Sequence, residues 1–163
     1  TRDVNYWNSR KNPKSYTAKE AAFVDKVKQA IPADALVLNQ PYDGSAYAWG
    51  ADGLNVYYKA WQGNWMGKPT AANTVIRTKL DRIGRNRSVC AAVQETGAEY
   101  LLVLDQSDYK KDKARPKSMV SMYASYLKSD WKGIDSVNDT TAGFTTMLSE
   151  GDMRLYKITA RCQ

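Results

Sequence analysis

Polar side chains that could do chemistry follow two apolar segments of the chain. The run 35–38 is followed by Asn39, Tyr42, Asp43 and Ser45, and the run 99–104 is followed by the polar group 105–108. In open α/β sheets ligands bind beyond the carboxyl ends of the strands, so these groups could meet in one cleft. Asp43 and Asp105 could there act as an acid/base pair or bind a cation. The alternative is that they are turn, cap and strand-end residues.

Aromatic residues interleaved with Asn, Gln, Asp, Ser and Gly fill the segment 42–65. Such rings can stack on a flat partner, such as a sugar, while their polar neighbours hydrogen-bond its edges. Trp61 and Trp65 lie in a glycine-containing loop and are the better candidates for an exposed platform, the alternative being that both fold back on the domain. Trp49 is expected in the core. The alternative is that all these rings pack inside a small domain.

Several classes of site have no counterpart in the sequence. The chain has no histidine, the commonest general base and metal ligand. It contains no G-x-G-x-x-G, P-loop or G-x-S-x-G motif, and its two cysteines cannot form a zinc pattern. We therefore expect no cofactor, no metal and no catalytic residue, and we do not expect this domain alone to be an enzyme.

Positive charge predominates, with 24 Lys and Arg against 17 Asp and Glu, a net charge of +7. This balance favours anionic partners, although it could simply keep the protein soluble. Basic residues cluster at 77–87 and 110–117, and neither cluster resembles a nucleic-acid-binding module, so no nucleic-acid partner is expected. The candidate anion contacts are Arg77, Lys79, Arg82, Arg85 and Arg87.

The two cysteines, Cys90 and Cys162, lie far apart in the sequence. In a cytosolic protein they would be inert core thiols, whereas in a secreted domain they would be paired. We favour the disulfide, because Cys162 is one residue from the end of the chain, where a bridge would stop fraying.

Capping signals and periodicity predict the secondary structure. A capping box, Thr17 to Glu20, opens a helix that ends at Pro32, and 99–105 is the clearest strand. We expect further helices at 45–49, 70–83, 88–97 (capped by Ser88) and 116–127, and strands at 35–38, 54–58, 143–148 and 153–159. This order predicts an α/β fold, a three-layer, mostly parallel sheet with helices on both faces and a C-terminal antiparallel hairpin.

The length of 163 residues fits one domain, which we place at 17–163 after an irregular segment, 1–16. No apolar run approaches the roughly 20 residues that span a bilayer, and we identify no signal peptide. The chain opens on a polar segment, so we expect it to be a piece of a longer protein.

Four phrases carry a resemblance to a known family. They are IPAD at 31–34, NQPYDGS at 39–45, GAEYLLVLD at 97–105 and RLYKI at 154–158. In order and spacing they resemble the extracytoplasmic C-terminal region of large polytopic membrane proteins of actinobacteria, which are similar to the C-type, lipid-phosphosugar-dependent glycosyltransferases. The resemblance covers about residues 17–162.

The resemblance implies a location on the extracytoplasmic face of the cell membrane and attachment to the remainder of a polytopic membrane protein. It implies no catalytic residue here, because the catalytic acid of such enzymes lies between membrane helices. We therefore expect a non-catalytic domain that positions or recognises a cell-envelope glycan or anionic polymer. The alternative is a structural or protein-interaction domain without a small ligand.

Overall fold

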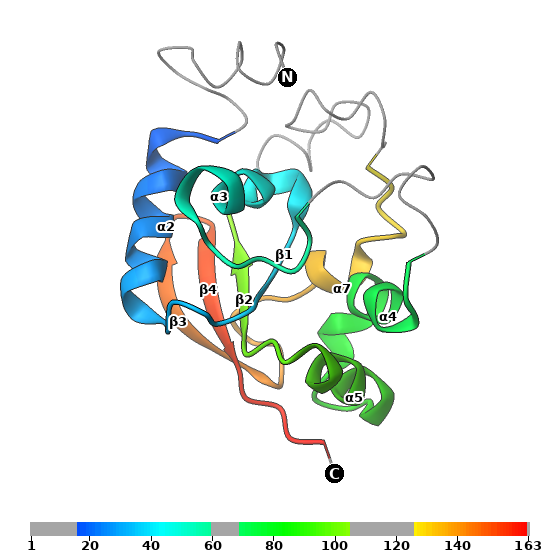
Figure 1. Ribbon diagram of the computed structural model, residues 1–163. Helices are drawn as coiled ribbons and strands as arrows, with labels where there is room; N and C mark the ends of the chain where they lie inside the picture. Colours follow the sequence, from blue (N-terminus) through cyan, green and yellow to red (C-terminus); the bar gives the residue numbers. More distant parts are fainter. Residues whose placement is uncertain (1–15, 60–68, 105–125, 163) are drawn as a thin grey trace.

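The computed structural model describes residues 16–59, 69–104 and 126–162. One four-stranded sheet, in the order β1-β2-β4-β3, forms its centre (Figure 1). The strands are β1 (Val37–Asn39), β2 (Tyr100–Val103), β3 (Phe144–Glu150) and β4 (Met153–Ile158). The helices are α2 (Ala18–Ala30), α3 (Ser45–Asp52), α4 (Ala71–Lys79), α5 (Arg87–Thr96) and α7 (Lys132–Asp135), with short 3₁₀ turns η1 (Pro41–Asp43) and η3 (Leu80–Arg82).

The directions of the strands correct the predicted fold. β1 runs parallel to β2, but β4 is antiparallel to both β2 and β3, so the sheet is mixed and mostly antiparallel. The expected C-terminal hairpin is confirmed, and it turns at Gly151, where φ is 58°. The prediction of a mostly parallel sheet is wrong because β4 inserts next to β2, so the hairpin supplies half of the strands.

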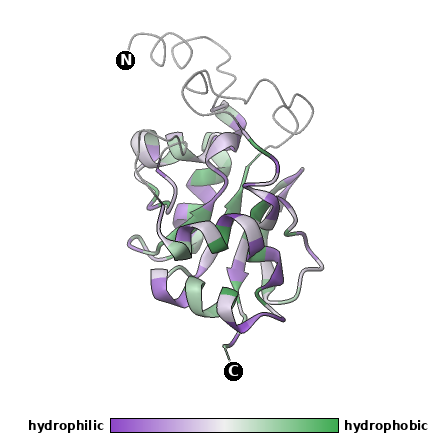
Figure 2. Ribbon diagram, turned by 90° about the vertical axis from the view of Figure 1, so that its right-hand side faces the viewer, coloured by the Kyte–Doolittle hydropathy of each residue, from purple (hydrophilic) through white to green (hydrophobic). Residues whose placement is uncertain are grey.

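Helices cover both faces of the sheet through the alternation of β2. Tyr100 and Leu102 pack on the side of α2, while Leu101 and Val103 pack on the side of α4 and α5. Figure 1 shows α2 on one side of the strands and α4, α5 and α7 on the other. In Figure 2, which faces this second side, hydrophobic positions alternate with hydrophilic ones along the helices, as expected of helices with one buried stripe.

The predicted strand 54–58 is present only as a single parallel bridge, Val37 to Val56. Val37 makes two backbone hydrogen bonds to this segment, and then the pairing stops. The Asn39 side chain takes the next place, because its Oδ1 accepts from the Tyr58 N–H at 2.8 Å and its Nδ2 donates to the Tyr58 carbonyl at 3.0 Å. A side-chain amide thus replaces a backbone rung of the ladder.

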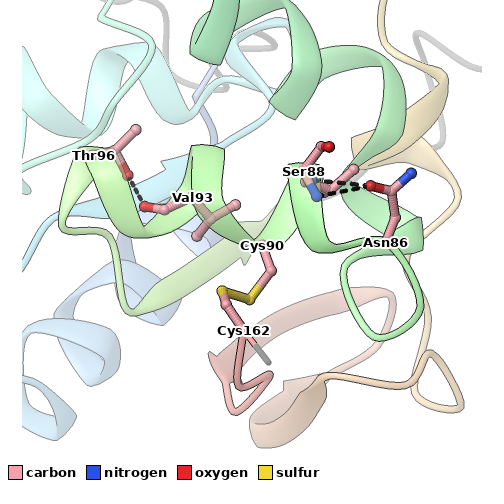
Figure 3. The surroundings of a disulfide bond; sticks show 7 residues. Asn86, Ser88, Cys90, Val93, Thr96 and Cys162 are labelled. Carbon is pink, nitrogen blue, oxygen red and sulfur yellow. Dashed lines mark hydrogen bonds between the residues drawn. A yellow bond between two sulfur atoms is a disulfide. The ribbon is translucent and has the colours of Figure 1, made fainter.

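Local capping sets the helix ends. The predicted capping box of α2 is present, with Thr17 Oγ1 accepting from the Glu20 N–H at 3.2 Å. The cap of helix α5 lies two residues earlier than predicted, because Asn86 and not Ser88 caps it (Figure 3). Asn86 Oδ1 accepts from two backbone N–H groups, which satisfies donors that the first turn of a helix leaves free.

The predicted disulfide between Cys90 and Cys162 is present, with the two Cα atoms 5.5 Å apart (Figure 3). Cys90 is buried on α5, and Cys162 follows the last strand. The bond therefore ties the end of the chain to the helical layer.

Loss of the disulfide should destabilise the domain strongly. The bond spans 72 residues of sequence, and the entropy of the unfolded chain gives it a stabilisation of about 4 kcal/mol. We expect the double variant Cys90→Ala/Cys162→Ala to lose about this much free energy of unfolding, measured by urea denaturation. Reductant should lower the wild-type stability similarly and leave the double variant unchanged; equal stability of both proteins would contradict this account.

Helix α7 lies unusually close to the end of α4. A Cβ atom built on Gly133 would lie 2.3 Å from the Lys79 nitrogen and 2.4 Å from the Leu80 nitrogen. Both neighbours are backbone atoms, so they cannot rotate aside as a side chain would. Only glycine allows this approach.

We expect Gly133→Ala to lower the free energy of unfolding by about 3 kcal/mol, because the two backbones must separate. Gly50→Ala is the matched control. No atom lies within 4 Å of a Cβ at Gly50, which is inside α3, so alanine there should change stability by no more than about 1 kcal/mol, upward. Urea denaturation of both variants compares them, and similar losses would show that the close approach is not the cause.

Candidate functional site

The four predicted ligand residues of the first polar group are buried beneath the end of the sheet. Asn39, Tyr42, Asp43 and Ser45 are each at most 1% exposed. Ser45 Oγ donates to the Gln40 carbonyl at 2.8 Å and accepts from Asn39 Nδ2 at 2.8 Å. The polar atoms of Asn39 and Ser45 therefore hydrogen-bond to each other and to the backbone, as buried polar groups do.

Asp43 joins the ends of the two parallel strands. Its Oδ1 accepts from the Ser45 N–H and its Oδ2 accepts from the Leu104 N–H, both at 2.9 Å. β1 and β2 are neighbours, as the proposed cleft required. The contact between their ends, however, is a carboxylate bonded to backbone, which favours the turn and cap alternative for this residue.

A second polar group lies beside the first and was missed in the sequence. Gln40 Nε2 donates to Asp135 Oδ1 at 2.7 Å, and the Tyr126 hydroxyl donates to Asp135 Oδ2. Burial, followed by this hydrogen bond, raises the pKa of Tyr126. No local signal marks Asp135, which lies about 95 residues from Gln40; only the fold brings them together.

Aromatic rings of the hydrophobic core surround these two polar groups. Trp131 packs edge-on against Tyr42 and Tyr58, with ring centroids 5.7 Å and 5.0 Å away. Burial raises the pKa of Tyr42 to about 12, so its hydroxyl keeps its proton at neutral pH. Trp49 differs from the prediction, because it is 47% exposed on α3 with Lys59 Nζ 5.1 Å from its ring centroid.

The five candidate anion contacts divide into two groups. Arg77 is only 9% exposed, and its guanidinium lies over the Trp131 ring, 5.5 Å from the centroid. The other four are exposed where α4 passes through η3 into α5. We call this surface the α4–α5 corner; it consists of Lys79, Arg82, Arg85 and Arg87.

Several predicted features fall outside the described residues. These are Trp61, Trp65, the polar group 105–108 with Asp105, the basic cluster 110–117 and the helix 116–127, apart from its last residues. Within the described ranges, no group of three or more His, Cys, Asp or Glu side chains is arranged to hold a metal ion. No helix in the same ranges combines the length and the apolar character that crossing a membrane requires.

Comparisons with known proteins found a match to a sequence family and a similarity to a solved structure. The sequence model of a family of unknown function (DUF6541) matches residues 2–160. No curated protein matches the sequence. The structure is similar to the C-terminal globular domain of an oligosaccharyltransferase from Archaeoglobus fulgidus, at 11% identity and a TM-score of 0.48, covering 87% of this chain and 97% of that one.

The hydrogen bonds of Asp43 predict a structural role that mutation can test. Asp43→Asn keeps the shape but turns an N–H group toward one of the two backbone donors, so we expect a loss of about 3 kcal/mol in the free energy of unfolding. Asp34→Asn makes the same change at an exposed site and should alter stability by less than about 0.5 kcal/mol. Urea denaturation would measure both, and an unchanged Asp43→Asn protein would reopen a ligand role.

Proposed function

This chain belongs to the family of unknown function DUF6541, and within it we propose a non-catalytic domain on the extracytoplasmic side of the cell membrane that contacts an anionic glycan or polymer. The rest of a polytopic membrane protein would carry any glycosyltransferase-like chemistry. The exposed cations of the α4–α5 corner would make the contact. The observation that carries this proposal is the charge of that corner.

The disulfide supports the location. Cys90 and Cys162 are bonded, and the described residues include no free cysteine. Disulfides persist in oxidising compartments and are rare in the cytosol, where thiols are kept reduced. A domain outside the membrane would meet the sugars and anionic polymers of the cell envelope.

The α4–α5 corner supports the ligand class. Among the described residues, none of its four cations forms an ion pair, whereas Lys26 and Arg154 elsewhere each pair with a carboxylate. The segment 77–87 holds one acidic residue, Asp81, beside its five basic ones. Exposed cations that form no ion pair with the described residues attract a polyanion, and this attraction does not require a deep pocket.

Two carboxylates of the described residues, Asp43 and Asp139, have structural roles. Asp43 bonds to backbone N–H groups and is buried. Asp139 bonds to Arg154 Nε at 3.0 Å, and this contact above all lowers the pKa of Asp139. Both carboxylates make contacts that hold the fold, whereas Asp105, the expected acid/base partner of Asp43, lies outside the described residues. These contacts support binding over catalysis for the described part of the chain.

Binding to polygalacturonate, a polymer of acidic sugars, would test the proposal. We expect calorimetry to show binding that weakens with salt, because screening shortens the reach of exposed charges. The variant Arg82→Glu/Arg85→Glu should weaken it by about tenfold or more. Neutral dextran should not bind.

The matched control is Lys19→Glu/Lys157→Glu, which changes the net charge equally. Lys19 is on α2, and Lys157 alternates with Tyr156 on β4, so neither belongs to the α4–α5 corner. This variant should bind nearly as the wild type does. Equal losses in the two variants would show that net charge alone attracts the polymer, and an absence of binding at low salt would refute the proposal.

A further inference from the structure

Helix α4 carries a second basic feature, which points inward. The Arg77 side chain is more than nine-tenths buried, and no ion pair joins it to a carboxylate in the described part of the chain. Within the described residues, its Nη2 makes one long hydrogen bond, 3.4 Å, to Thr74 Oγ1, and its Nε–H has no hydrogen-bond partner. Burying a charge without a counter-charge is costly, because the charge loses its contacts with water.

Asn73 lies one helical turn before Arg77 and has the complementary defect. Its side-chain Oδ1 is buried and also lacks a hydrogen-bond partner among the residues that the structure describes. Its backbone is fixed, because its N–H donates to Thr70 Oγ1 at 3.2 Å and its carbonyl accepts from the Tyr58 hydroxyl at 2.8 Å. Residues four apart on a helix share a face, so this donor and this acceptor belong to the same face of α4.

Aromatic rings adjoin this pair. The Arg77 guanidinium packs on Trp131, and its charge opposes the rise that burial causes in the pKa of both Tyr42 and Tyr58. The Tyr58 ring lies edge-on to Trp131, 5.0 Å between centroids. The surroundings therefore combine one cation, one carbonyl acceptor and apolar ring surface, which is a small set of polar groups in an otherwise apolar place.

We propose that Asn73 and Arg77 form a subsite for one acidic sugar unit. This rests on the proposed function and specifies the ligand unit. The sugar carboxylate accepts from the Arg77 Nε–H and supplies the missing negative charge, and a neighbouring sugar hydroxyl donates to Asn73 Oδ1. A simple anion satisfies only the first group, and a neutral sugar leaves the charge unpaired. Both atoms are buried, so the protein must open locally before the sugar can reach them.

The Nε–H signal of Arg77 in a proton–nitrogen NMR spectrum reports on this subsite directly. Arg77→Lys, which lacks this group, assigns the signal. We expect glucuronate to shift it at millimolar concentration, at least about tenfold lower than acetate or inorganic phosphate requires at equal ionic strength, whereas glucose should not shift it. Asn73→Ala should remove the preference for glucuronate over acetate.

Arg161→Lys is the matched control, because Arg161 is exposed and lies outside the α4–α5 corner, and it should leave the titration unchanged. If Arg77→Lys does not fold, the Arg77 signal can be assigned through its backbone connections in the wild type. No shift with glucuronate, or equal shifts with acetate or phosphate, would overturn the subsite. Loss of polygalacturonate binding in Arg82→Glu/Arg85→Glu tests the corner alone, so the two proposals can fail separately.

Discussion

Two side chains take over where the backbone of the central strands stops pairing. The Asn39 side chain continues the ladder of β1 by hydrogen-bonding to the backbone N–H and carbonyl of Tyr58. The Asp43 carboxylate closes the end of β2 by accepting from the Leu104 N–H. A buried backbone group without a partner costs about as much as a lost hydrogen bond. The positions of η1, the start of α3 and the segment 54–58 therefore depend on these two side chains, which is why polar residues in this place are buried.

Helix α4 then separates positive charge into two environments. Its exposed end contributes to the α4–α5 corner, where water screens each cation, while Arg77 is held among rings where little water can screen it. An anion approaching the corner would gain modest, salt-dependent attraction, whereas a contact with Arg77 would be stronger and more selective. Long-range attraction would thus come from the α4–α5 corner, and local selection from Arg77.

The sequence predicts features that depend on neighbouring residues. Thr17 with Glu20 marks the start of α2, and Gly151 marks the hairpin turn. It does not predict where β4 inserts, because a buried apolar strand looks the same beside a parallel or an antiparallel neighbour. Asn39 and Asp43 looked like ligand residues because their partners are distant in sequence. Arg77 looked exposed because it lies in a run of charges; its place beside the buried Ile76 was the available signal.

The bond between Cys90 and Cys162 also changes how the domain would carry a mechanical load. Tension applied at residue 162 passes through the disulfide to α5. The loop between the two cysteines, which are 72 residues apart in sequence, therefore carries no load. That keeps roughly 240 Å of contour length from being released when the fold opens. A force on residue 162 would act on the helical layer and not on the β3–β4 hairpin, so the domain would extend only a short distance when it unfolds under load.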